Sequence, residues 1–212
     1  MSNDNFGIPE ISLRHLKSAL YVTDHKNVTR AANKLNRSQT AVTKAISELE
    51  DTLGSKLFDR SSTGMMPTVY GEALAHRIRG AVAEFEAART ALEEFHPGGK
   101  GLQSSPIFNL DVSYKRLAAF IALPEKRDVS GAANALGITK AAVYNSVRQL
   151  EELLETELFQ REPRGVAPTP YCNVLARHTK LAFAEIRHAV EDIAKLDGIT
   201  KGSVIIGTLP YT

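Results

Sequence analysis

Apolar residues recur along this 212-residue chain at intervals of three and four, which is the spacing of one face of a helix. The clearest such stripe lies in a helix predicted to begin after Ser38, a good N-cap residue, and to stop at Gly54. Its apolar members are Val42, Ile46, Leu49 and Leu53. Because the opposite face is polar, the pattern predicts a helix that is buried on one side and exposed on the other.

Other elements are predicted on both sides of this helix. Two short helices precede it, over residues 13–25 and 29–35, with Thr29 as the N-cap of the second. After it, SKLFDRSSTGMMPTVY is typical of two short strands around a turn at residues 62–64, because apolar residues precede the turn and a proline follows it. A long helix with a continuous apolar stripe is then expected over residues 71–95.

The same order of elements returns 101 positions later without a gap, as Ala41 and Ala142 illustrate. SQTAVTKAISELEDTLGSKLFDR at residues 38–60 is matched by TKAAVYNSVRQLEELLETELFQR at residues 139–161. The second copy predicts a hairpin and four helices, over residues 112–123, 129–136, 140–155 and 171–197. Three helices followed by a hairpin make a winged helix-turn-helix. The predicted fold is therefore mainly α, with two tandem winged units that are each followed by a long helix.

These elements imply boundaries between segments. The segment HPGGKGLQSSP, which follows the first long helix, is rich in glycine and proline and is expected to be a flexible linker. Residues 198–212 contain a β-branched run at 204–206 and are expected to begin a truncated further domain. The predicted segments are 11–70 (first winged unit), 71–96 (first long helix), 97–110 (flexible linker), 111–170 (second winged unit), 171–197 (second long helix) and 198–212 (start of a truncated domain).

Composition and charge narrow the class of protein. With 43% hydrophobic and 24% charged residues the chain is typical of soluble globular proteins, and its single cysteine excludes an intramolecular disulfide. The sequence shows no secretion signal and no long apolar run, so a cytoplasmic location without a membrane partner is expected. Lys and Arg outnumber Asp and Glu by nine to five over residues 11–70, but only by eight to seven over 112–171. The first unit should therefore attract phosphate more strongly.

The outer face of the third helix suits double-stranded DNA in each unit. Its N-terminal side chains can reach base edges when such a helix enters the major groove. Glutamine can bond adenine, threonine offers a hydroxyl and a methyl group, and lysine reaches guanine or phosphate. The predicted DNA-contact residues of the first unit are Arg30, Ser38, Gln39, Thr40, Thr43, Lys44 and Arg60. Those of the second unit are Thr139, Lys140, Ala141, Tyr144, Asn145, Arg148, Arg161 and Arg164.

Residues 11–95 resemble the N-terminal DNA-binding domain of LysR-type transcriptional regulators. The motifs that carry the resemblance are an Ala-Ala pair, Ser-Gln-x-Ala-Val, Leu-Glu-x-x-Leu-Gly, Leu-Phe-x-Arg and Thr-x-x-Gly. The second unit is similar but has Thr139-Lys140 for Ser-Gln, Glu155 for the helix-ending glycine and Cys172 for the later glycine. The tail GSVIIGTLP is similar to the opening strand of the effector domain of this family, so a small-molecule effector is expected only if a longer chain carries that domain.

The resemblance also implies that the long helices join two chains into a homodimer or a higher homo-oligomer. Their apolar stripes would form that interface. The predicted dimerisation residues are Leu74, Ile78, Val82, Phe85, Leu92, Leu175, Leu181, Ile186, Val190 and Ile193.

Two alternatives to this scheme stay open. The second unit, with its weaker charge, could serve as a protein-protein interaction or dimerisation module, or the two units could pack together within one chain as a pseudo-dimer. Neither metal-ligand spacing nor a catalytic arrangement is recognisable among the six histidines, so no metal, cofactor or enzymatic activity is expected. Cys172 begins a helix, which can lower a thiol pKa, but an inert and partly buried thiol is the preferred interpretation.

Overall fold

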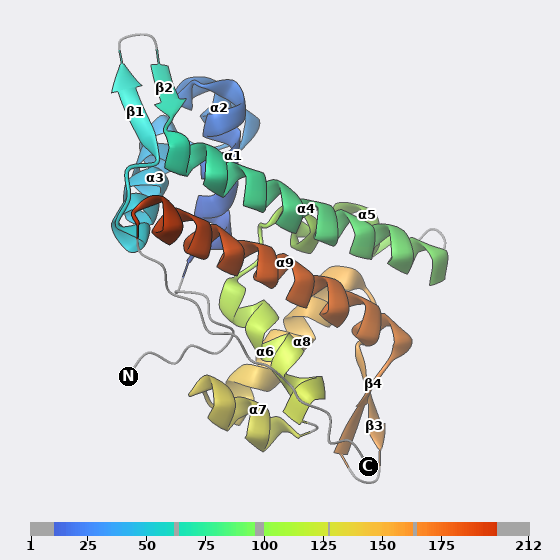
Figure 1. The fold of residues 1–212 in the computed structure, drawn as a ribbon. Coiled ribbons are helices and arrows are strands. Elements are labelled where there is room, and N and C mark those ends of the chain that lie inside the picture. The colour runs from blue at the N-terminus through green and yellow to red at the C-terminus, as the bar shows by residue number, and fades with distance from the viewer. Residues whose placement is uncertain (1–10, 62–63, 96–99, 127, 163–164, 199–212) are drawn as a thin grey trace, which may run out of the picture.

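The computed structural model describes residues 11–61, 64–95, 100–126, 128–162 and 165–198, and these residues are mainly helical (Figure 1). The first unit consists of α1 (Leu13–His25), α2 (Val28–Lys34), α3 (Gln39–Leu53), β1 (Phe58–Ser61), β2 (Gly64–Pro67) and α4 (Val69–Phe95). A connecting segment contains α5 (Lys100–Ser104) and the 3₁₀ helix η1 (Pro106–Asn109). The second unit consists of α6 (Tyr114–Lys126), α7 (Val129–Leu136), α8 (Lys140–Leu154), β3 (Phe159–Glu162), β4 (Gly165–Pro168) and α9 (Pro170–Leu196). The predicted fold of tandem winged units with long helices is confirmed.

Local capping explains where most of these helices begin. Ser38 Oγ accepts a hydrogen bond from the Ala41 N–H at 3.1 Å, as predicted, and Thr139 Oγ1 accepts from Ala142 at the same distance. The expectation for α2 was wrong: Asn27 Oδ1 accepts from the Arg30 N–H, so the helix starts before Thr29. In the second unit, α6 continues two residues beyond Pro124, where it was expected to end.

The third helices and the hairpins end alike in both units. Gly54 ends α3 with φ of 69°, and Glu155 ends α8 with φ of 51°, a left-handed conformation that is strained for a glutamate. Both hairpins are antiparallel and share one register, with Phe58 opposite Pro67 and Phe159 opposite Pro168. The backbone therefore repeats even where the side chain does not favour it.

Helices α4 and α9 lie side by side and run antiparallel (Figure 1). Near the start of α4, Tyr70 donates a hydrogen bond to Asp197, just beyond the end of α9, at 2.7 Å. Near the start of α9, Tyr171 donates to the Leu92 carbonyl in the last turn of α4 at 3.4 Å. Each long helix thus spans from its own winged unit to the other unit.

The predicted dimerisation stripes are covered within a single chain. Seven of the ten residues are buried: Leu74, Ile78, Phe85, Leu92, Leu175, Ile186 and Ile193. Val82 and Val190 are half-buried, and Leu181 is exposed. Within one chain, α4 and α9 pack together and bury most of these residues. That the stripes join two chains stays a prediction. The structure adopts the intramolecular pseudo-dimer that had been the alternative.

The connecting segment is part of the packed structure. Its residues Leu102, Ile107, Phe108 and Leu110 are buried. Asp111 is held at α1 by an ion pair with Lys17 and by a hydrogen bond from Arg14 to its carbonyl. The prediction of a flexible linker over residues 97–110 is therefore wrong for residues 100–110, because their apolar side chains enter the core; residues 97–99 lie outside the described part of the chain.

One apolar core extends through both units. It includes side chains from α1, α3, α4, η1, α6 and α9, whereas a smaller cluster around Val143 and Val147 belongs to the second unit alone. Phe85 of α4 lies in the shared core and is fully buried. The two units are therefore expected to unfold together.

We expect Phe85→Ala to lower the free energy of unfolding by about 3–5 kcal/mol, because it leaves a cavity in the shared core. Urea unfolding followed by circular dichroism measures this, with exposed Ala87→Ser on the same helix as a control that should change stability by less than about 0.5 kcal/mol. Two separate transitions in the unmodified protein would contradict the idea of a shared core.

Candidate nucleic-acid interface

The start of α3 exposes the polar side chains predicted to contact DNA. Gln39, Thr40 and Lys44 are exposed and Thr43 is half-buried, while the opposite face of the helix is buried in the core. Lys44 Nζ lies 3.5 Å from Glu48 Oε1, but the lysine side chain is 76% exposed. Such an exposed ion pair is weak, so the ammonium group stays available to a phosphate or a guanine.

Ser38, Arg30 and Arg60 extend this exposed surface around α3. The Ser38 hydroxyl is exposed but is engaged as the N-cap, so it already has a hydrogen-bond role. Arg30 lies on α2 and Arg60 on β1, and both side chains are exposed. Helix α3 is therefore flanked by a cation on each neighbouring element, as a surface that follows a phosphate backbone requires.

The start of α8 exposes a different set of side chains. Lys140, Ala141 and Asn145 are exposed, and Tyr144 is 56% exposed. Arg148 Nε lies 3.4 Å from Glu152 Oε1 in a pair in which both side chains are mostly exposed. Thr139 is also exposed and caps the helix. Of the predicted cations of the second hairpin, Arg161 belongs to β3 and Arg164 lies outside the described residues.

A glutamate in each third helix holds the hairpin in position. Glu50 Oε1 accepts hydrogen bonds from the Leu57 and Phe58 N–H groups at 2.8 and 3.1 Å. Glu151 Oε1 does the same for Leu158 and Phe159 at 2.8 and 3.2 Å. From the sequence alone, Leu-Glu and Leu-Phe stand out only as motifs, and the link between them is not predicted. Their constant separation in both copies was the available signal.

Arg37 is a further positioning residue, which the sequence motifs do not indicate. Its guanidinium donates to the Ser18 hydroxyl at 3.1 Å, and Ser18 is fully buried in α1. This bond ties the turn between α2 and α3 to the core, which sets the angle at which α3 is presented.

The threonine of the Thr-x-x-Gly motif secures the junction between hairpin and long helix in both units. Thr68 Oγ1 donates to the Lys56 carbonyl at 2.6 Å, and Thr169 Oγ1 donates to the Glu157 carbonyl at 3.1 Å. A Cβ atom at Gly71 would lie 2.2 Å from the Leu57 carbonyl oxygen, so this position requires glycine. The equivalent residue of the second unit is the buried Cys172. The motif is therefore structural rather than a DNA contact.

The environment of Cys172 makes its thiol unreactive. Burial first, and the nearby Glu151 carboxylate second, raise the pKa of the Cys172 thiol to about 12. The position at the start of α9 does not lower it. This environment supports the interpretation of Cys172 as an inert thiol and not as a reactive one.

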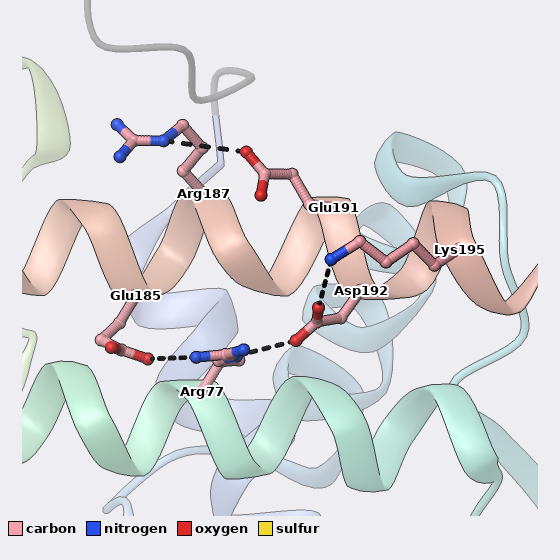
Figure 2. Close-up of polar contacts among 6 residues, drawn as sticks. All are labelled: Arg77, Glu185, Arg187, Glu191, Asp192 and Lys195. Carbon is pink, nitrogen blue, oxygen red and sulfur yellow. Dashed lines mark hydrogen bonds and ion pairs between the residues drawn. The ribbon is translucent and has the colours of Figure 1, made fainter. Parts of the chain in front are cut away.

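Figure 2 shows the ion pairs that join the two long helices. Arg77 of α4 lies between Glu185, at 3.2 Å, and Asp192, at 2.8 Å, on α9. Burial tends to raise the pKa of Asp192, but hydrogen bonds from Arg77 and Lys195 outweigh it and hold the pKa below its ordinary value. The carboxylate is therefore ionised at neutral pH and strengthens the pairing.

One contact between the long helices occurs twice, with the roles of α4 and α9 exchanged. Arg77 pairs with Glu185, and His178 Nδ1 lies 2.8 Å from Glu84 Oε2. Position 178 is the counterpart of 77, and 185 is the counterpart of 84, each 101 positions later. A contact from i to j that recurs from j to i is the signature of two-fold symmetry. The two units are therefore related by a pseudo-two-fold axis that passes between α4 and α9.

This axis determines where the third helices lie. Helix α1 packs against both α3 and α4, and α6 packs against both α8 and α9. A two-fold rotation leaves the position along its axis unchanged, so α3 and α8 lie on the same side of the α4/α9 pair. The two hairpins extend in opposite directions (Figure 1). One face of one chain thus presents two third helices.

Comparison with known proteins identifies the family. The model of the bacterial regulatory helix-turn-helix proteins of the lysR family matches residues 13–72 and again residues 114–173, which together are more than half of the chain. The chain belongs to the LysR family. Both winged units of this LysR-family protein are matched, so the resemblance inferred from the motifs is confirmed for each.

Relatives with assigned names are transcriptional regulators. The HTH-type transcriptional regulator GalR of Pseudomonas putida is 30% identical over 199 residues, which are 94% of this chain and 48% of that protein. CfxR of Cupriavidus necator is 28% identical over 193 residues, or 88% of this chain and 57% of that protein. PcaQ of Agrobacterium fabrum is 43% identical over 99 residues, or 47% of this chain and 32% of that protein. The chain spans about half the length of GalR, and no solved structure matches it significantly.

Two other kinds of site are absent from the described part of the chain. Within it, no helix is both long and apolar enough to cross a membrane. Nor do three or more His, Cys, Asp or Glu side chains come together there as a metal ion would require.

We expect Glu50→Ala to lower the free energy of unfolding by about 1–3 kcal/mol, because two partly buried N–H groups lose their acceptor. Chemical denaturation checks this, and Asp51→Ala, on the exposed face of the same helix, should change stability by less than about 0.5 kcal/mol. Equal effects of the two substitutions would show that Glu50 has no special role.

We expect Cys172 to react very slowly with Ellman's reagent at pH 8. A pKa near 12 leaves about one thiol in 10⁴ ionised at that pH, and burial blocks access to it. In denaturant the thiol should react fully within minutes. Rapid stoichiometric labelling of the native protein would contradict this assignment.

Proposed function

We propose that this protein is a sequence-specific DNA-binding transcriptional regulator in which a single chain carries two recognition helices, α3 and α8. The observation that carries the proposal is the pseudo-two-fold pairing of α4 with α9, because it turns both recognition helices toward the same side. The family match to both units supports DNA binding by each.

The symmetry of the chain suits the symmetry of duplex DNA. Double-stranded DNA has local two-fold axes perpendicular to its own axis, and dimeric helix-turn-helix proteins align their symmetry with one of them. Here α3 and α8 replace the recognition helices of two subunits. Exposed side chains at the start of each helix supply base contacts, and Arg30, Arg60 and Arg148 supply cations for the backbone.

Binding as a single chain follows from how the long helices are used. Most of the residues predicted to join two chains are already buried between α4, α9 and the rest of the core. Association of chains through these stripes, as predicted from the sequence, would first have to separate α4 from α9. We therefore propose that the unit that binds one operator is one chain, with any larger assembly built through other surfaces.

A second candidate function keeps DNA binding for the first unit alone. In this case the second unit is a protein-protein interaction module. Its nearly balanced charge and the exposed ring of Tyr144 near the start of α8 favour this candidate. The pseudo-symmetric presentation of α8 beside α3 favours the first proposal, because an interaction module has no need of it.

Two sets of substitutions separate these candidates. The DNA is a duplex that the full 212-residue protein selects from a random library. One double variant combines Gln39→Ala with Lys44→Ala, and the other combines Lys140→Ala with Arg148→Ala. We expect each double variant to bind this duplex more weakly. Each lost phosphate contact should also lower the slope of log affinity against log salt by about one. Arg177→Ala, an exposed cation on α9, is the matched control and should leave both quantities unchanged.

Footprinting and solution mass complete the test. The proposal predicts protection over two half-sites by a complex with one chain per duplex. If the substitutions in α8 change the oligomeric state while affinity and footprint stay the same, the second candidate replaces the first. If the full chain selects no duplex at all, neither candidate holds.

A further inference from the structure

We infer that one chain recognises a non-palindromic operator, made of two unlike half-sites, and binds it in a single orientation. This inference rests on the proposed function and adds the class of DNA sequence that the site accepts. It rests on three observations. The two units have similar backbones, and the outward side chains of α3 and α8 differ. The pairing of α4 with α9 holds the two units in a fixed order.

The backbones of the two recognition helices are presented in the same way. Both helices are capped by a hydroxyl that accepts a hydrogen bond at 3.1 Å, and both end in a left-handed residue. Both hold their hairpin through a glutamate carboxylate. Equivalent positions of α3 and α8 therefore face equivalent places in the two half-sites, so any difference in base readout must come from the side chains.

The outward side chains differ at every equivalent position. Along α3 the order is Gln39, Thr40, Thr43, Lys44 and Ser47, and along α8 it is Lys140, Ala141, Tyr144, Asn145 and Arg148. The amide comes first and the lysine later in α3, whereas the lysine comes first and the amide later in α8. Amides favour adenine and lysine favours guanine, so the two helices prefer purines in opposite order along their half-sites.

Other substitutions reinforce the difference. Thr43 is half-buried and short, whereas the equivalent Tyr144 projects a large ring that is 56% exposed. Tyrosine hydroxyls donate to phosphates, so Tyr144 suits the backbone and leaves less space for a base contact at its position. Ser47 has no charge, whereas its counterpart Arg148, one turn beyond Tyr144 on α8, adds a cation. The second half-site is therefore held with more backbone contact around the recognition helix.

The ion pairs between α4 and α9 favour the pairing of unlike units. If two first units paired through their α4 helices, Arg77 would face Glu84 and Ala91, since Ala91 is the counterpart of Asp192. If two second units paired through α9, Asp192 would face His178 instead of Arg77. Pairing like with like thus removes the Arg77–Asp192 contact. The buried connecting segment further keeps both units of one chain together.

The order of the half-sites cannot be exchanged once the units are paired. Turning the chain by 180° about its pseudo-two-fold axis places α8 on the half-site that α3 prefers, and α3 on the half-site that α8 prefers. Each base pair that is then misread weakens binding by roughly tenfold, so several misread pairs exclude the reversed orientation. The protein should therefore distinguish the two directions along DNA, which a symmetric dimer cannot do.

The first experiment selects duplexes from a random library with the full 212-residue protein. The expected result is two unlike half-sites at a constant spacing and order. An inverted repeat built from either half-site should bind at least tenfold more weakly than the selected duplex. A selected palindrome, or a single half-site, would overturn the inference and leave DNA binding intact.

The second experiment reads the orientation directly. Asp59→Cys, on the exposed surface of β1, carries an attached iron–EDTA group, and the native Cys172 is buried. We expect strand cleavage at one end of the operator only. Equal cleavage at both ends would mean that both orientations are bound, and the inference would fail.

The third experiment exchanges the outward side chains. In the grafted variant, Lys140→Gln, Ala141→Thr, Tyr144→Thr and Asn145→Lys make α8 resemble α3, so it should prefer an inverted repeat of the first half-site by at least tenfold. A control variant also places the α8 residues on α3 and should bind the original operator in reversed orientation. Thermal unfolding checks that both variants fold. If one of them does not fold, the first two experiments decide whether the operator is bound in a single orientation. Failure of the unmodified chain to select any duplex would instead sink the proposed function.

Discussion

The antiparallel packing of α4 against α9 is the interaction on which the rest of the structure depends. It buries the apolar stripes of two 27-residue helices, continues the core of one unit into the other and places the third helices α3 and α8 on one side. The helices approach closely at the centre: a Cβ atom at Gly80 would lie 3.0 Å from Glu185 Oε2, so a larger residue would displace this side chain. The counterpart of Gly80 is Leu181, which is exposed, so the two halves of the interface are similar but not interchangeable.

A pseudo-dimer within one chain has a physical advantage over a dimer of separate chains. Tethering replaces the concentration of a second subunit by an effective concentration that is on the order of millimolar for short linkers. The connecting segment is more than a tether here, because Ile107, Phe108 and Leu110 are buried and Asp111 is anchored to α1. Pairing of the two units is therefore part of folding, and its stability does not depend on protein concentration.

The motifs shared by the two units serve the scaffold and not the predicted DNA contacts. Glu50 and Glu151 hold the hairpins, while Thr68 and Thr169 join each hairpin to its long helix. The side chains on the outward face of α3 and α8 carry no such duty, so they can differ without loss of the fold. This separation of roles explains how two units with nearly the same backbone can expose different side chains on their third helices.

The sequence by itself determined the order of the elements, most of their ends, the buried face of each third helix and the family. These follow from local chemistry, such as the Ser38 cap, the Gly54 stop and the period of the apolar residues, and that chemistry needs no distant contacts. Only the tertiary structure decided that α4 pairs with α9 of the same chain and that residues 100–110 are packed. An apolar stripe indicates that a helix face must be covered, but it does not indicate which helix covers it. The glycines just before α5 favoured the prediction of a flexible linker, although the apolar residues that follow them are buried. The choice of partner came from long-range packing and from ion pairs such as Arg77 with Asp192, whose members lie far apart in the chain.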